Sequence, residues 1–584
     1  MSATLFKEVN YSLAKLIQDI EFGEIGLPEI QRPFVWANTK VRDLFDSMYK
    51  GFPVGYLLFW ANGLENGHRQ IGTDSKQKVP RLLIVDGQQR LTSLFAVLKG
   101  VSVVREDYKT ERISIAFRPK DQKFEVADAA IRRDPEFIQD ISTLWSSSTD
   151  IFELTDHYLD GLRASRQVNP EELRSIRQAI SNLYNLQSYP FTALELSPTV
   201  NEEQVAEVFV RINSKGTSLN QADFILTLMS VFWDTGCSEL EQFCRDARTA
   251  SIRTPSPFNY FFEPDPDQLL RVSVGLGFRR ARLQHVYSIL RGKDLGTGDF
   301  SDTRRETQFA VLKDAQGYVL NVVNWHEFFK VLVRAGYRRA NMITSHVSLL
   351  YAYTFFLLGK REYGVDGYTL RNVIARWFFM TALTGRYTGN PETIMEQDLA
   401  RLRDVKDAVG FVSLLDHIIA DTLTKDYWEI ALPNELATSS AQSPAQFAYF
   451  AALNLLDANV LFSKMKVSQL LDPALHSNKS SIERHHLFPK AYLRRLEITE
   501  PRDTNQIANY ALVEWSDNIS IADTPPAEYF PKYAVRLSSE ELASMCYWHA
   551  LPEGWDRLDY QEFLVLRRKG IARVIREGYR RLWE

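Results

Sequence analysis

The stretch Leu82-Leu83-Ile84-Val85-Asp86-Gly87-Gln88-Gln89-Arg90-Leu91-Thr92-Ser93-Leu94 decides the fold of the first part of the chain. Its first four residues form a short apolar, partly β-branched run, which predicts a buried strand. From residue 88 to residue 99 the apolar residues recur at the spacing of one helix face, at Leu91, Leu94, Phe95 and Leu98. A buried strand that runs directly into an amphipathic helix predicts a region that mixes strands and helices, over roughly residues 1–225.

The turn between this strand and this helix is a candidate anion site. The free backbone N–H groups and the positive dipole end of a helix favour an anion at its start. Gly87 lets the backbone approach a phosphate, Gln88 and Gln89 can donate hydrogen bonds, and Arg90 can grip phosphate oxygens. Asp86 can hold a divalent cation or orient water. The alternative is an ordinary turn in which Asp86 caps the helix and Arg90 is solvated.

A second chemical signal lies near the C-terminus, in Ser481-Ile482-Glu483-Arg484-His485-His486-Leu487-Phe488-Pro489-Lys490, followed by Asn509 and Asn518. Adjacent histidines end a short β-like run, and successive strand residues face opposite sides. One imidazole can therefore face a metal ion while the other faces the water that attacks a phosphate. This order of residues is typical of a metal-assisted phosphodiester nuclease. The alternative is that two of the ten histidines simply adjoin in a surface turn.

The composition of the chain limits the classes of function that the protein can have. A chain of 584 residues exceeds an ordinary single core, so several domains are expected. The net charge of −4 excludes a globally basic nucleic-acid binder, and any DNA contact must come from local basic surfaces. Three cysteines cannot form a disulfide framework, which favours a reducing compartment. No signal peptide is visible, and the longest apolar stretch, 347–359, is too short to span a bilayer. We expect a cytoplasmic protein with no membrane partner.

The composition along the chain predicts three regions. Residues 1–228 mix strand and helix signals, and residues 229–440 contain long apolar stretches of helix length, such as 349–358 and 373–383. A small, polar segment near 438–445 predicts a domain junction. Residues 441–584 carry the paired histidines and end in a basic helix. The expected fold class is therefore α+β and multidomain.

Two local basic clusters are candidate DNA surfaces. The C-terminal helix concentrates cations at Arg567, Arg568, Lys569 and Arg573, with further arginines beyond them. Clustered cations bind phosphates without sequence specificity, because binding releases counterions. Residues 279–282 form a second cluster. The alternative for both is a solvated helix face with ordinary salt bridges.

The motifs resemble those of the GmrSD family of modification-dependent (type IV) restriction systems and related phage-defence nucleases. The stretch 84–94, preceded by Gln31-Arg32-Pro33-Phe34-Val35-Trp36, resembles the family's N-terminal domain. Residues 209–224 resemble a further motif of that domain. Residues 483–490 with Asn509 and Asn518 resemble the family's C-terminal HNH nuclease.

The resemblance implies a ParB/sulfiredoxin-like nucleotide-binding domain over 1–228, a helical connector over 229–440, and a ββα-metal (HNH) nuclease domain over 441–584. In the first domain it implies that Asp86 is the acidic centre of a site that binds or hydrolyses a nucleotide. The residues expected on the phosphates or in the walls of that site are Gly87, Gln88, Gln89, Arg90, Arg32, Arg211 and Asn213.

In the nuclease domain, the resemblance implies His485 as a metal ligand, His486 as the general base, Asn509 as the brace of the loop, and Asn518 as the residue that completes the metal site. Many HNH enzymes carry an acidic residue directly before the base, whereas this chain has His485. Oxygen ligands suit Mg²⁺ or Mn²⁺, and imidazole also tolerates Zn²⁺ or Ni²⁺. We expect Mg²⁺ (or Mn²⁺) with waters and substrate phosphate.

The predicted function is that of a prokaryotic anti-phage DNA endonuclease or nickase. Hydrolysis of a nucleoside triphosphate by the N-terminal domain is expected to control metal-dependent cleavage at the HNH site. The expected partners are a nucleotide and double-stranded DNA, in particular modified DNA from phage or another foreign source. The chain could also form a homo-oligomer, which the sequence does not decide. One alternative is a nucleotide-regulated DNA-binding module with a weak or degenerate nuclease site. Another is a toxin-like nuclease whose N-terminal part only binds partners.

Overall fold

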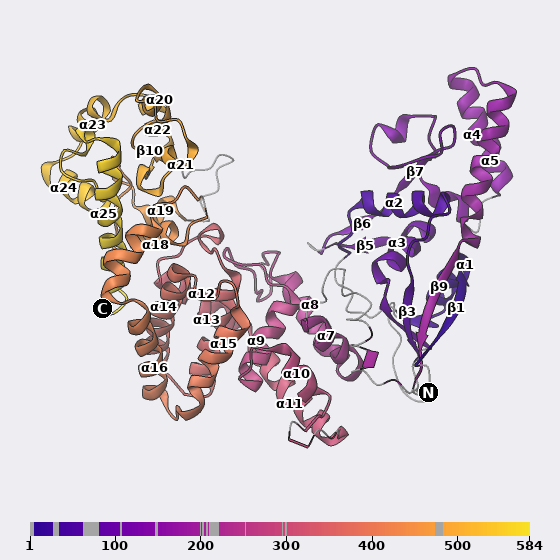
Figure 1. Cartoon of the computed structure of the whole chain (residues 1–584), viewed down its shortest axis with the longest axis horizontal. Coiled ribbons are helices and arrows are strands. Elements are labelled where there is room, and N and C mark those ends of the chain that lie inside the picture. Colours follow the sequence, from indigo (N-terminus) through magenta and orange to yellow (C-terminus); the bar gives the residue numbers. More distant parts are fainter. Residues whose placement is uncertain are drawn as a thin grey trace. The chain divides into compact units, whose positions relative to one another are not determined.

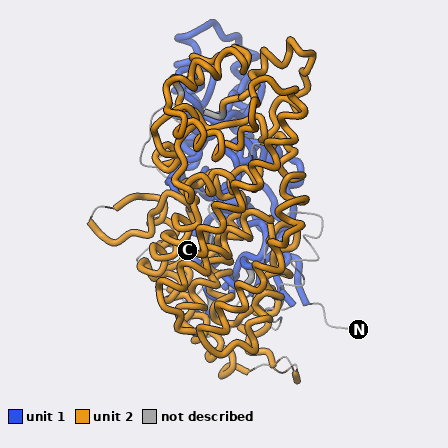
Figure 2. The backbone as a smooth tube through the Cα atoms, turned by 90° about the vertical axis from the view of Figure 1, so that its left-hand side faces the viewer, with its two compact units in different colours: residues 1–234 blue, residues 235–584 orange. Residues whose placement is uncertain are grey.

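The computed structural model describes residues 5–26, 34–61, 81–105, 108–146, 150–198, 200, 204–205, 208, 221–251, 253–294, 296–297, 299, 301–440, 442–472 and 483–584. The chain forms two compact units, residues 1–234 and 235–584 (Figure 2). The predicted α+β class is confirmed, with a mixed sheet in the first unit and a largely helical second unit.

The first unit is built on a five-stranded mixed sheet. In spatial order its strands are β1 (Phe6–Ser12), β9 (Pro190–Leu196), β3 (Leu57–Ala61), β4 (Leu82–Asp86) and β2 (Ile25–Gly26). The pairs β1–β9 and β3–β4 are antiparallel, whereas β9–β3 and β4–β2 are parallel. The strand predicted at 82–85 is β4.

Helices cover one face of this sheet and form the main core of the unit. They are α1 (Leu13–Glu21), α2 (Asn38–Tyr49) and α3 (Gln88–Lys99). The predicted apolar face of α3 is confirmed, because Leu91, Leu94 and Leu98 are buried in this core. Side chains alternate along a strand, so Leu57 and Phe59 join this core while Leu58 joins a smaller apolar cluster.

The segment between α3 and β9 adds two hairpins and a helical pair. The hairpins are β5 (Ser102–Val104) with β6 (Thr110–Arg112), and β7 (Ile115–Arg118) with β8 (Lys123–Val126). Helices α4 (Ile151–Ser165) and α5 (Pro170–Tyr184) follow, and the unit ends with α7 (Gln221–Phe232).

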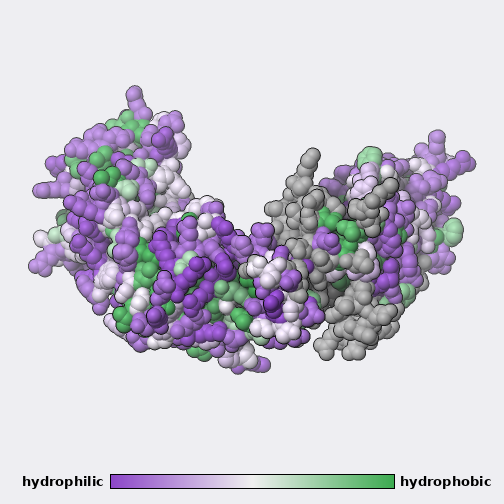
Figure 3. All heavy atoms as spheres, turned by 60° about the horizontal axis from the view of Figure 1, so that its bottom comes forward, coloured by the Kyte–Doolittle hydropathy of each residue, from purple (hydrophilic) through white to green (hydrophobic). Residues whose placement is uncertain are grey.

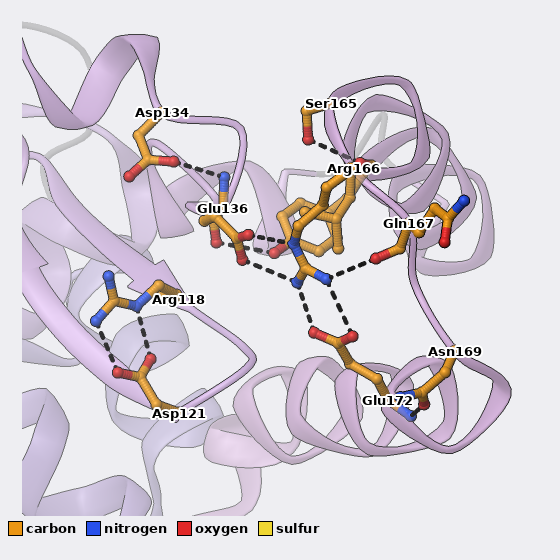
Figure 4. Close-up of polar contacts among 11 residues, drawn as sticks. Arg118, Asp121, Asp134, Glu136, Ser165, Arg166, Gln167, Asn169 and Glu172 are labelled. Carbon is orange, nitrogen blue, oxygen red and sulfur yellow. Dashed lines mark hydrogen bonds and ion pairs between the residues drawn. The ribbon is translucent and has the colours of Figure 1, made fainter.

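One arginine ties the helical pair to the segment that follows β8 (Figure 4). Arg166, at the end of α4, donates hydrogen bonds to both carboxylate oxygens of Glu136 and to both of Glu172 in α5. The Glu172 contacts measure 3.0 and 2.5 Å. The two carboxylates raise the pKa of Arg166, and Arg166 lowers the pKa of Glu172. The helical pair is thus tied to the loop after β8.

The second unit begins with a bundle of helices. Its elements are α8 (Asp234–Asp246), α9 (Pro266–Phe278), α10 (Leu283–Leu290), α11 (Asp302–Val319), α12 (Val322–Arg334), α13 (His346–Arg361), α14 (Gly367–Thr384), α15 (Pro391–Ala400) and α16 (Ala408–Thr422). The predicted helices at 349–358 and 373–383 are α13 and α14, which pack side by side and are buried along most of their length (Figure 1). Among the described residues, no helix has both the length and the apolarity needed to cross a bilayer.

The remainder of the second unit carries the histidine pair. Helices α17 (Leu432–Glu435), α18 (Pro444–Leu455) and α19 (Val467–Leu470) lead to β10 (Glu483–His486), α20 (Lys490–Arg495) and α21 (Pro501–Thr504). Strand β11 (Tyr510–Val513), α22 (Trp515–Ile521), α23 (Pro526–Ala534), α24 (Ser539–Trp548) and α25 (Tyr560–Arg580) complete it. Helix α18 packs against both α14 and α25. The expected junction near 440 is therefore not a boundary between compact units, since both sides share one unit.

Candidate active site

A two-stranded antiparallel ribbon followed by a short helix positions the paired histidines. Strand β10 pairs with β11 so that His485 lies opposite Ala511 and His486 lies opposite Tyr510. Helix α22 begins directly after β11 and Glu514. Because the two histidines are successive residues of a strand, their rings face opposite sides, and each ring has its own set of contacts.

His485 faces inward toward α22. Its side chain is buried, its ring meets Tyr529 edge-on, and Nδ1 lies 2.8 Å from Oδ1 of Asn518. Nε2 is also buried and has no hydrogen-bond partner among the described residues. Burial lowers the pKa of His485 to about 4, so the ring is neutral at pH 7, the state that a metal ligand requires.

The donors of His485 and Asn518 fit a small divalent cation. Two neighbouring ligands of an octahedral ion, at bonds of about 2.1 Å, lie about 3 Å apart. In this structure the 2.8 Å contact is a hydrogen bond from Nδ1–H of His485 to Oδ1 of Asn518, and a metal ion held between these two atoms at the same spacing would replace that proton. Within the described part of the chain, no group of three or more His, Cys, Asp and Glu side chains forms a metal cluster. The nearby Asp517 pairs with Arg536 at 3.1 Å, so among the described side chains His485 and Asn518 form a neutral donor pair.

His486 occupies the other side of the ribbon and is only half-buried. Its ring packs on Tyr510 with 4.5 Å between centroids, and its Nε2 lies 3.1 Å from Oδ1 of Asn505. Burial lowers the pKa of His486, while the Asn505 contact opposes that effect. A half-buried, neutral imidazole is a usable general base near pH 7.

Asn509 holds the turn that follows the histidines. Its side chain is fully buried; Oδ1 accepts from the Phe488 N–H at 2.8 Å, and Nδ2 donates to the carbonyls of Phe488 and Thr504. Its own carbonyl accepts from the Leu487 N–H at 2.8 Å. Tyr529 adds a hydrogen bond from its hydroxyl to the Leu487 carbonyl. These contacts pin the backbone directly after His486.

Arg567 corrects the expected DNA surface on α25. The side chain is fully buried and donates to the carbonyls of His549 and Ala508. A guanidinium enclosed in this way braces the residue next to Asn509 and cannot reach a phosphate. The neighbouring cations differ: Lys569 is exposed, Arg568 is half-buried with a contact of 3.4 Å to Gln506, and Arg573 is exposed on the ring of Tyr547.

The second basic cluster is largely engaged in ion pairs. Arg279 pairs with Glu362, and Arg280 pairs with Glu396 at 2.7 Å. Glu396 also accepts from the N–H groups of Ala281 and Arg282. These contacts favour the alternative of a salt-bridged surface for residues 279–282.

The turn at Asp86 has the expected geometry but a different role for Arg90. Gly87 adopts a φ of +95°, and a Cβ there would lie 2.4 Å from Leu57 Cδ2. Arg90 donates to the carbonyls of Val54 and Tyr56 at 2.6 and 2.7 Å and pairs with Asp86 at 3.4 Å. These contacts hold the guanidinium on the loop before β3, and the expected grip of Arg90 on phosphates stays a prediction.

The remaining expected residues of this turn lie near one another. The Gln89 side chain accepts from the Val35 N–H at 3.2 Å, which ties α3 to the segment after residue 33. Nε2 of Gln88 is buried and lacks a hydrogen-bond partner within the described residues. Asp86 is partly exposed beside them. Arg32, Arg211 and Asn213 lie outside the described residues.

Three residues of the histidine site were not expected from the sequence. Asn505, Tyr510 and Tyr529 contact the histidines or the turn after them. Only the polar segment Thr504-Asn505-Gln506, which lies just before Asn509, could have indicated Asn505. Tyr510 and Tyr529 look like ordinary core aromatics.

Comparison with known proteins relates the first unit to one protein family. Residues 13–230 match the family model of the GmrSD restriction endonuclease N-terminal domain. This match supports a GmrSD-type N-terminal region and suggests a restriction-type defence endonuclease. The chain is also similar to the uncharacterized protein MJ0686 of Methanocaldococcus jannaschii, with 22% identity over 559 residues, which cover 89% of this chain and 86% of the relative.

Proposed function

We propose that this protein is a prokaryotic defence endonuclease or nickase that hydrolyses DNA phosphodiesters at the His485–His486 site. The observation that carries the proposal is the ribbon β10–β11 followed by α22, which brings both histidines together with Asn509 and Asn518. The family match of the first unit supports DNA of foreign origin as the substrate.

In the proposed reaction, each residue of the site has a separate task. His486 accepts the proton of a water whose oxygen attacks the phosphorus, so that a new P–O bond forms and the bond to the leaving oxygen breaks. His485 and Asn518 would hold a Mg²⁺ or Mn²⁺ ion. When bound, such an ion neutralises the charge that develops on the phosphate and the leaving oxygen. Asn509 keeps the turn after His486 in place.

We further propose that the first unit binds and hydrolyses a nucleoside triphosphate at the turn after β4 and thereby controls cleavage. The helix start at Gln88, the close backbone approach at Gly87 and the partly exposed carboxylate of Asp86 support this role. Arg90 would act indirectly, by fixing the loop that carries Val54 and Tyr56. Base-modified DNA is the proposed trigger.

One observation favours a second candidate, a nucleotide-regulated DNA-binding module with a weak or degenerate nuclease site. The donor set near His485 is neutral, and the described residues hold no metal cluster of His, Cys, Asp and Glu. A site with two neutral donors binds a divalent cation less strongly than one that includes a carboxylate. Intact His486, Asn509 and Asn518 oppose this candidate.

The test is a cleavage assay with purified protein, Mg²⁺, a panel of nucleotides, and plasmid DNA with and without base modification. The wild type should nick or cut the DNA, and His486→Ala should abolish cleavage while it leaves folding and DNA binding intact. His157→Ala, at an exposed position of α4, is the matched control. Wild-type cleavage by His486→Ala would refute the assigned base. DNA binding and phosphate release without any cleavage would favour the binding module.

A further inference from the structure

We propose that Asn505 is the positioning residue of the general base, and that it holds His486 in the tautomer with the proton on Nε2. This inference rests on the proposed function, since it assigns a task within the cleavage reaction. No sequence motif assigned a role to Asn505, and the residue lies on neither strand of the ribbon.

The tautomer follows from the shared acceptor. Oδ1 of Asn505 lies 3.1 Å from Nε2 of His486, and it also accepts a hydrogen bond from the Tyr510 hydroxyl at 3.2 Å. A carboxamide oxygen accepts and does not donate. The ring nitrogen that contacts it must therefore carry the hydrogen, and the lone pair of the neutral imidazole remains on Nδ1.

The backbone around Asn505 is held on both sides. Its N–H donates to the Pro501 carbonyl at 3.0 Å, which ends α21. The preceding carbonyl, that of Thr504, accepts from Asn509 Nδ2 at 3.0 Å, and the Asp503 carbonyl accepts from the Tyr560 hydroxyl of α25. Asn505 is thus anchored independently of His486.

Asn509 connects the base with its positioning residue. One amide group bonds both to Phe488, two positions after His486, and to Thr504, one position before Asn505. A fully buried side chain thus links the backbone segment that carries the imidazole with the segment that carries its acceptor. The Tyr510 ring then limits rotation of the His486 ring from the side, with 4.5 Å between centroids.

This arrangement determines which atom takes part in the reaction. The water proton is transferred to Nδ1 of His486 while the water oxygen forms its bond to phosphorus, and Nε2–H stays bound to Asn505. In other enzymes, the hydrogen bond made by one ring nitrogen decides which nitrogen is free for chemistry. A neutral amide in this place orients the ring without adding a negative charge to the site.

The first measurement is the tautomer itself, by NMR of the full-length protein with ¹⁵N-labelled histidine. At about pH 8, where the imidazole is neutral, His486 should show a protonated Nε2 and an unprotonated Nδ1, assigned by the signal that His486→Gln removes. Asn505→Leu should redistribute the two tautomers. A wild-type ring protonated on Nδ1, or a tautomer that Asn505→Leu leaves unchanged, would overturn the inference.

The second measurement is cleavage kinetics. Asn505→Leu should lower kcat about 10- to 100-fold with KM unchanged, as loss of an orienting partner does elsewhere. Asn505→Asp keeps an acceptor and should restore most of the rate. Asn454→Leu, which removes a side-chain bond to the Gly336 carbonyl elsewhere in the same unit, is the control for loss of a structural asparagine. An unchanged kcat in Asn505→Leu would count against the inference.

The two measurements also separate this inference from the proposed function. If the wild type cleaves no DNA, the nuclease proposal fails, and the NMR experiment still decides whether Asn505 sets the tautomer. If the wild type cleaves and the tautomer is the opposite one, the nuclease proposal stands and the assignment of Asn505 fails. The wild-type spectrum identifies the tautomer even where Asn505→Leu does not fold.

Discussion

At the residue scale, Gly87 limits what the turn before α3 tolerates. Gly87→Ala should destabilise the first unit by about 2–4 kcal/mol, because a side chain at φ +95° is strained and its Cβ would lie 2.4 Å from Leu57 Cδ2. Gly161→Ala, inside α4 with no atom within 4 Å of the added Cβ, should instead stabilise by about 0.5–1 kcal/mol. Urea unfolding of both variants measures this, and equal stabilities would contradict the structural role of Gly87.

Single residues also show where sequence patterns mislead. Arg90 and Arg567 look like surface cations that bind anions, and both are used inside the protein. Their acceptors are backbone carbonyls far along the chain: Arg90 contacts Val54, 36 positions away, and Arg567 contacts Ala508, 59 positions away. A local pattern cannot predict such partners, because they depend on tertiary packing.

The histidine site was more predictable at this scale. The opposite orientation of His485 and His486 follows from the period of a strand, and the two rings do have separate contacts. Asn509 was expected as the brace of the loop, and its amide group bonds to Phe488 in the turn after His486. Asn505 was missed because its contact depends on the end of α21, and no local pattern predicts that position.

At the element scale, α25 carries both a buried cation, Arg567, and exposed cations such as Lys569. The double variant Arg568→Gln/Lys569→Gln should weaken DNA binding. It should also reduce the steepness of the fall of log K with the logarithm of salt concentration, by about 1 for each phosphate that the variant no longer neutralises. Arg403→Gln/Lys406→Gln, at two exposed positions elsewhere in the unit, controls for the loss of two positive charges. Fluorescence anisotropy from 50 to 200 mM salt measures the slopes, and a slope unchanged in the double variant would remove α25 from the DNA surface.

Arg567→Met belongs to the same helix but should act through stability. It removes hydrogen bonds to the carbonyls of His549 and Ala508 inside the core and leaves both carbonyls without this partner. The expected loss is about 1–3 kcal/mol in the free energy of unfolding. Binding of DNA by the folded fraction, measured at low temperature, should stay near the wild-type value. A large loss of affinity with normal stability would instead restore Arg567 to the DNA surface.

The pair α4–α5 should show a pH dependence that comes from Glu172. Arg166 lowers the pKa of Glu172 in the folded state, so the stabilisation is complete above the unfolded pKa of about 4.3 and is lost as the pH falls through the folded pKa. Glu172→Gln should lower Tm by about 2–4 °C at pH 7, and the difference should shrink as the pH falls below the unfolded pKa and vanish once Glu172 is protonated in the folded state as well. Glu171→Gln, one position earlier in α5, is the control; a difference that persists in acid would contradict the ion pair.

Local sequence patterns predict individual strands and helices better than they predict which strands pair. The strand β4 and the helices α3, α13 and α14 were expected because each one is a continuous periodic or apolar run. The pairing of β1 with β9 was not, since it joins strands from opposite ends of the first unit's sequence, such as Tyr11 with Phe191. Sheet order depends on such long-range contacts, and no local pattern specifies them.

At the scale of the whole molecule, the polar segment near 438–445 lies inside the second compact unit. The composition near 438–445 is small and polar, and we expected a domain junction there. The Ile507 N–H donates to the Thr438 carbonyl at 3.0 Å, which ties this segment to the residue two positions before Asn509. Helix α18 then packs on α14 and α25.

On the face drawn in Figure 3, hydrophilic residues cover most of the described surface, and apolar residues gather only in small patches.

The two compact units lead to a prediction about the division of activities. Asp86→Ala should abolish phosphate release from the nucleotide and remove the response of cleavage to nucleotide, because its carboxylate lies in the first unit at the turn after β4. His486→Ala should abolish cleavage and leave phosphate release intact, because its imidazole lies in the second unit. Parallel assays of both activities on both variants and the wild type measure this. If cleavage by Asp86→Ala responds to nucleotide as the wild type does, the first unit does not control the nuclease through this turn; if His486→Ala also loses phosphate release, the two activities do not reside in separate units.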